Sequence, residues 1–84
     1  MDEAHLQKRL EVFQSLMLKQ IKSNEHKGDW NDKTVLELSL SLFKNLNKLM
    51  THSLSLDWPG VTASAVDCAN VAFFIADRTG ICGG

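Results

Sequence analysis

The residues best suited to chemistry lie in the last third of the chain, within a segment that is otherwise apolar. In "AVDCANVAFFIADR", Asp67 and Asn70 stand among alanine, valine, phenylalanine and isoleucine residues, and Asp77 follows further along. Because residues three apart on a helix share a face, Asp67 and Asn70 would point in nearly the same direction. Buried acids are rare unless they are paired or bind a metal. Asp67 is therefore a candidate ligand for a metal or a substrate; alternatively, it caps another element or pairs with a lysine.

A second group of candidates lies in the polar stretch "NEHKGDW", Asn24 to Trp30. His26 could act as a general base, but no nucleophile stands near it in the sequence, and histidines of solvated loops are common. Trp30 could anchor the loop, since aromatic side chains dominate small cores. Asn70 could read a base or a ribose, or form a hydrogen bond across a helical interface.

The elements that must position these residues are predicted to be helices, which gives an all-α fold. We expect three helices, at about 3–23, 33–52 and 62–79. The first helix follows from apolar residues at steps of three and four, the spacing of one helical face: Leu6, Leu10, Phe13, Met17 and Ile21.

The second helix is predicted against a competing strand pattern. From Val35 to Phe43 apolar and polar residues alternate, as in a half-buried strand. A strand here would lack a convincing partner, and an isolated hairpin is marginal. Leucines also favour a helix over a strand. Thr34 and Glu37 have the spacing of a capping box. The apolar residues cover more than half of this helix, which indicates burial by more than one neighbour.

The third helix is predicted to follow a turn. Pro59-Gly60 is a strong turn signal, Thr62 is a plausible N-cap, and Gly80 is well placed to end the helix. Small residues along it would let another helix approach closely.

The length and composition indicate a single domain, residues 1–84, that needs a partner. A chain of 84 residues buries a modest fraction of its surface and is marginal alone. We expect Cys68 and Cys82 to be free thiols, so no disulfide compensates. Assembly of a homodimer or tetramer, as a helical bundle, is the remaining way to enlarge the core.

The charge balance argues against a nucleic-acid partner. Nine basic and ten acidic residues nearly cancel and form no basic stripe. The N-terminus lacks a basic region leading into an apolar run, as a secretory signal would have. The longest apolar run, "CANVAFFIA", is far below the roughly 18 residues of a spanning helix. We therefore expect a cytoplasmic protein with no membrane partner.

Two of these stretches resemble a known family. "AVDCANVAFFIADRTGI" is similar to the closing helix of the MazG-like, all-α nucleotide pyrophosphohydrolases, which in some members reads close to E-x-x-D-V-A-N-F-x-M-M-I-A-D. "NEHKGDW" resembles the H-K-G-G/D-W stretch before the second helix of such members. The order of the parts also fits, so the resemblance covers about residues 24–81. The residues of the closing helix that match are Asp67, Ala69, Asn70, Ile75, Ala76 and Asp77.

The resemblance implies hydrolysis of a nucleoside triphosphate to a monophosphate and pyrophosphate. In the family, E-x-x-E on the second helix and E-x-x-D on the closing helix hold Mg²⁺, which favours octahedral oxygen ligands and activates a water. The resemblance makes Asp67 the catalytic and metal-binding residue. It makes Lys27, Trp30 and Asn70 substrate-binding residues.

The chain departs from the family pattern at the other metal-binding positions. The expected carboxylates are replaced by Ser64 on the third helix and by Ser41, Leu42 and Asn45 on the second. Lys44 and Lys48 add positive charge there; they could bind phosphate in place of the metal, or form a solvated face. We therefore expect a MazG-like protein whose Mg²⁺-dependent hydrolysis of nucleotides is weakened or lost. The alternative is a non-catalytic helical oligomer that binds nucleotides or other proteins and needs no cofactor.

Overall fold

The computed structural model, which describes residues 2–24 and 30–80, confirms the all-α class. Among the described residues there is no strand, and the elements follow in the order α1 (Glu3–Ser23), η2 (Trp30–Asp32), α2 (Val35–Leu54) and α3 (Trp58–Arg78), where η2 is a single 3-10 turn. The first helix has the predicted bounds, and the second begins and ends two residues later than predicted.

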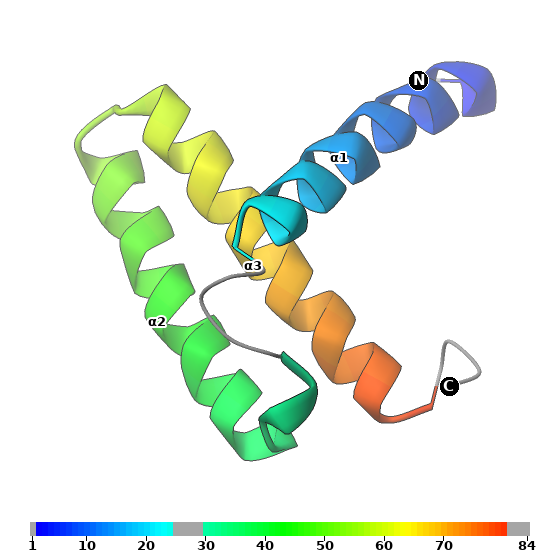
Figure 1. Cartoon of the computed structure of the whole chain (residues 1–84). Helices are drawn as coiled ribbons and strands as arrows, with labels where there is room; N and C mark the ends of the chain where they lie inside the picture. Colours follow the sequence, from blue (N-terminus) through cyan, green and yellow to red (C-terminus); the bar gives the residue numbers. More distant parts are fainter. Residues whose placement is uncertain (1, 25–29, 81–84) are drawn as a thin grey trace.

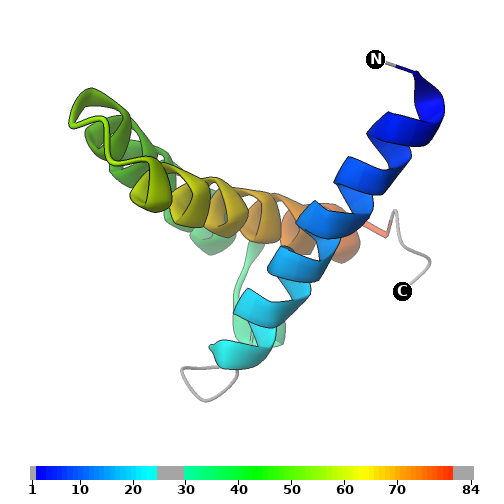
Figure 2. The ribbon, with the colours of Figure 1, turned by 90° about the horizontal axis from the view of Figure 1, so that it is seen from above.

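The last two helices form an antiparallel pair, and α1 lies across it. Figure 1 shows α2 and α3 side by side, joined at one end by a short connection, with α1 crossing α3 near its middle. Seen from above, the N-terminal half of α1 extends away from the pair (Figure 2). Only the C-terminal part of α1 is therefore placed to enclose a site with the other helices.

The second helix begins at the predicted capping box, and its alternating pattern is helical. The Thr34 hydroxyl accepts a hydrogen bond from the Glu37 amide at 3.1 Å, and the Glu37 carboxylate accepts one from the Thr34 amide at 3.1 Å. This reciprocal pair satisfies amides that the first turn leaves without partners. Leu38 is fully buried, whereas most other leucines of α2 remain exposed. Within one chain, the predicted burial by several neighbours is therefore not seen.

The predicted turn at Pro59-Gly60 and the predicted N-cap at Thr62 are wrong. The helix α3 begins at Trp58, and Asp57 is its N-cap, because the Asp57 carboxylate accepts a hydrogen bond from the Gly60 amide at 3.1 Å. Proline is tolerated in the first turn of a helix, since its missing N–H would have no intrahelical partner there. The predicted stop at Gly80 is confirmed: α3 ends at Arg78, and Gly80 adopts a φ of 91°, a left-handed conformation that glycine accepts readily.

The buried core is small and centres on the contact between α2 and α3. Its apolar members among the described residues are Leu38, Val66 and Val71. The buried polar residues Ser64 and Asn70 also lie on α3. The helices therefore meet around a mixed interior in which polar groups need partners.

By length and composition alone, α3 could cross a membrane. An 18-residue window within it has a mean hydropathy of 1.3. Polar residues such as Asp67 and Asn70 interrupt this window, so it contains no apolar run of that length. It is weak evidence for a membrane span, because a core helix of a soluble protein passes the same test.

Candidate functional site

All three helices and the η2 turn contribute to one cavity, with a volume of about 150 Å³. The end of α1, the η2 turn and the middle of the α2–α3 pair meet around it. Its described walls are rich in amide side chains, and Asp67 is the one carboxylate among them. The lining residues are Gln20, Ile21, Asn24, Trp30, Asn45, Asp67, Asn70, Val71 and Phe74.

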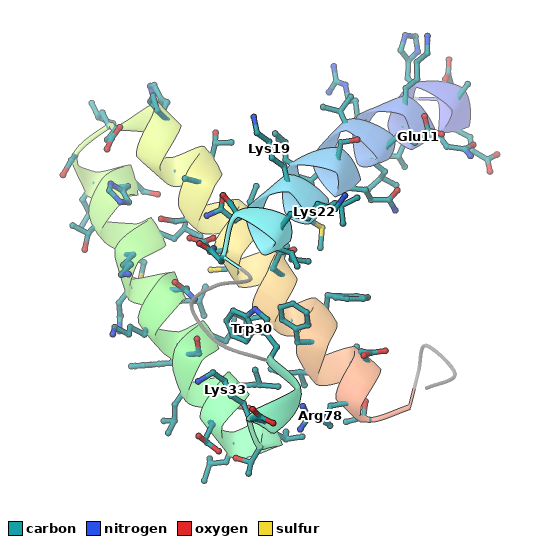
Figure 3. The ribbon with its side chains drawn as sticks, viewed as in Figure 1. Glu11, Lys19, Lys22, Trp30, Lys33 and Arg78 are labelled. Carbon is teal, nitrogen blue, oxygen red and sulfur yellow. The ribbon has the colours of Figure 1, made fainter. Side chains whose placement is uncertain are left out.

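An aromatic stack and an arginine fix one wall of the cavity. The rings of Trp30 and Phe74 are stacked, with centroids 4.8 Å apart and an interplanar angle of 19°. Arg78, at the end of α3, donates hydrogen bonds to the Trp30 carbonyl at 2.9 Å and to the Lys33 carbonyl. Figure 3 shows Arg78 close to the η2 segment that carries Trp30. Trp30 is thus held from both its ring and its backbone.

Asn70 joins α1 to α3 and leaves one acceptor unused. Its side-chain nitrogen donates a hydrogen bond to the Met17 carbonyl at 3.1 Å, which confirms the predicted bond across a helical interface. Its side-chain oxygen is buried and has no partner among the described residues. The residue is only 5% exposed, so water cannot freely replace that partner.

Asp67 lies one turn before Asn70 and is half-buried. The ion pairs among the described residues are Asp2–His5 and His52–Asp57, so a pairing of Asp67 with lysine is not found there. Asp67 also affects its neighbour: burial first, and then the Asp67 charge, raise the pKa of the Cys68 thiol. Asp67 therefore supplies negative charge to this part of α3.

The cavity brings together three of the four residues predicted from the sequence: Trp30, Asp67 and Asn70. The fourth, Lys27, lies outside the described residues, as does His26. Sequence reasoning missed the amides of Gln20 and Asn24, the ring of Phe74 and the anchor Arg78. Asn24, Phe74 and Arg78 lie within the two quoted stretches, but nothing in the sequence shows that they meet residues far away in the chain.

The described residues do not fit the magnesium site that the resemblance implies. They contain no group of three or more histidine, cysteine, aspartate or glutamate side chains that could hold a metal. Glu37 is exposed and engaged in the capping box, and Asp77 is exposed outside the cavity lining. Asn45 faces the same cavity as Asp67, where the resemblance places a carboxylate. One carboxylate among amides is fewer than the acidic oxygen ligands that the resemblance implies for Mg²⁺.

A scan against protein-family models, a search of curated proteins and a search of solved structures found no match for this chain. The resemblance to MazG-like proteins therefore rests on the two quoted motifs and on their order in the chain.

Proposed function

We propose that this chain is a MazG-related helical domain that binds a nucleotide in the cavity and has weakened or lost Mg²⁺-dependent hydrolysis. The observation that carries the proposal is the cavity itself. It gathers Trp30, Asp67 and Asn70, which the resemblance assigns to substrate and metal, while Asn45 takes the place of a carboxylate. Amide groups can still donate and accept hydrogen bonds to a ligand, but they cannot balance the charge of metal ions.

The first experiment measures pyrophosphate release from a panel of nucleoside triphosphates with Mg²⁺. We expect release at or near the uncatalysed background, both from the wild-type chain and from the Asp67→Ala variant. Release by the wild-type chain that Asp67→Ala abolishes would show a working enzyme and overturn the proposed loss of hydrolysis.

Binding is measured in parallel as nucleotide-dependent thermal stabilisation. A ligand present at one hundred times its Kd stabilises the native state by about 2.7 kcal/mol. For a domain of this size, that corresponds to a rise in Tm of roughly 10 °C or more. The absence of any shift across the panel would contradict the binding role.

A second candidate function, a protein-interaction module, is supported by a different observation. The outer face of α2 carries large apolar side chains that nothing in the single chain covers, among them Leu40 and Phe43. We propose that a second copy of the chain covers this face and forms a homodimer or tetramer. This assembly is compatible with nucleotide binding, because Leu40 and Phe43 do not line the cavity.

A further inference from the structure

The side-chain oxygen of Asn70 is a hydrogen-bond acceptor that has no donor among the described residues. It is buried, and Asn70 is one of the residues that line the cavity. Buried polar atoms in folded proteins nearly always have a partner, and an exception calls for an explanation. A ligand that brings an N–H or O–H group into the cavity would supply that partner.

The orientation of the Asn70 amide is fixed by its neighbour. The oxygen and nitrogen of an amide are often interchangeable in a structure, but here the group faces the Met17 carbonyl, which can only accept. The nitrogen must therefore point to α1, and the oxygen is the atom left for a ligand.

The charge of the cavity disfavours a phosphate inside it. Asp67 is the only charged side chain among the lining residues that the structure describes. A negative group would meet repulsion from Asp67, whereas an N–H donor would find a second acceptor there.

The size and shape of the cavity favour one planar ring. A cavity of about 150 Å³ can hold a benzene-sized molecule. The stacked rings of Trp30 and Phe74 form part of its wall. Three further amide side chains, those of Gln20, Asn24 and Asn45, can each donate or accept a hydrogen bond.

We propose that the cavity recognises the N–H edge of an uncharged planar heterocycle, the base of a nucleoside, through the Asn70 oxygen and the Asp67 carboxylate. Any phosphate groups remain outside the cavity. This inference rests on the proposed nucleotide binding and adds which part of the ligand enters the cavity. It makes Asn70 and Asp67 the residues that select the base.

The test compares nucleosides with analogues in which methyl groups remove the donors of the base and also enlarge it. Cytidine and uridine are titrated into the full chain, alongside analogues in which methyl groups replace the N–H hydrogens of the base, and binding is measured calorimetrically. A site built around a hydrogen bond rejects ligands that lack the donor. We expect methylation to weaken binding at least tenfold, and nucleosides to bind without Mg²⁺.

A matched pair of variants tests whether the charge of Asp67 contributes to nucleoside binding. Asp67→Asn removes the charge from the cavity wall at nearly constant shape, whereas Asp77→Asn makes the same change on α3 outside the cavity. We expect at least threefold weaker binding of the nucleoside by Asp67→Asn and unchanged binding by Asp77→Asn.

The outcomes separate this inference from the proposed function. Equal affinity for the methylated analogues overturns the donor recognition, while nucleotide binding stands. If only triphosphates bind, and only in the presence of Mg²⁺, the recognition of the base is overturned while nucleotide binding stands. Failure of every nucleoside and nucleotide to bind overturns both.

Discussion

Cys68 follows Asp67 in the chain, and the pKa of its thiol responds to the charge of this candidate site residue. Among the described residues it is a free cysteine, as expected, and it is half-buried on α3. Burial, followed by the charge of Asp67, raises the pKa of its thiol. The thiolate is the reactive form, so the native chain should keep this thiol protonated at neutral pH.

Alkylation of Cys68 should therefore have its half-maximal rate at a pH above that of an ordinary cysteine. The pH profile is measured by peptide-level mass spectrometry in a Cys82→Ser background, with iodoacetamide. We expect Asp67→Asn to shift the profile to lower pH, because the second cause of the raised pKa is removed. We expect Asp77→Asn to leave it unchanged. A native profile that coincides with the profile in denaturant would contradict the burial of the thiol.

The same pKa gives the direction of a stability effect. The folded state holds the proton of Cys68 more tightly than the unfolded state. Its contribution to stability is therefore present below the ordinary cysteine pKa and is lost as the pH rises through the folded pKa. Alkaline conditions should weaken the packing of α3 around this residue.

At the residue scale, the sequence predicted which residues belong to the site better than it predicted which atoms they contact. Asp67 and Asn70 stood out because polar residues on an apolar helix need partners. The partner of Asn70 is a backbone carbonyl 53 residues away, and Arg78 reaches carbonyls 45 and 48 residues away. Every residue has a carbonyl, so no sequence pattern distinguishes the ones that these side chains meet.

The start of α3 shows how a local signal can mislead at the scale of an element. Pro59-Gly60 predicts a turn, but Asp57 caps the helix one residue before Trp58. The Asp57 carboxylate also approaches the His52 ring, with 3.0 Å between oxygen and Nδ1. This contact links the end of α2 to the start of α3. The capping bond is local, between Asp57 and Gly60, and proline fits the first turn that it begins, so Pro59-Gly60 does not exclude a helix here.

Gly60 is required here for space and not for its backbone flexibility. A Cβ at this position would lie 2.5 Å from the Asp57 carboxylate and 2.5 Å from Nδ1 of His52. Alanine normally stabilises a helix relative to glycine by up to about 1 kcal/mol. Overpacking costs about 1–3 kcal/mol, so we expect Gly60→Ala to destabilise the chain by about 1 kcal/mol in urea unfolding.

The control for this prediction is the same change in a His52→Ala background. Without the imidazole ring, Asp57 can move aside, and Gly60→Ala should then stabilise the chain by up to about 1 kcal/mol. If the substitution has the same effect in both backgrounds, the contact between the helices does not determine the choice of glycine.

The whole molecule exposes more large apolar side chains than it buries. Leu38, Val66 and Val71 are its buried apolar residues in the described part of the chain. In contrast, five side chains on one stripe of α2 are between 61% and 85% exposed. The stripe follows the spacing of one helical face and consists of Leu36, Leu40, Phe43, Met50 and Leu54. An exposed apolar stripe of this kind, which Asn47 interrupts, is the kind of surface that a partner would cover.

A second copy of the chain is the partner that the small core favours. A domain that cannot bury enough surface alone needs its partner at all times, and another copy is always made with it. A two-fold axis would place the stripe of one α2 on the stripe of the other, since such interfaces are self-complementary. Such a dimer would explain the wide apolar girth of α2, which α3 covers on one side only.

Light scattering after size exclusion tests this assembly. We expect the wild-type chain to show a mass at least twice the 9.4 kDa of the monomer and a Tm that rises with protein concentration. Leu40→Glu combined with Phe43→Glu should reduce the mass to that of a monomer and lower the Tm, because charges cannot be buried in the interface without partners. Lys48→Glu changes the charge of the same helix outside the stripe and should leave the mass unchanged.

A wild-type chain that stays at 9.4 kDa and unfolds cooperatively would show that the small core suffices. The exposed stripe would then have to be covered by a different protein or remain in water.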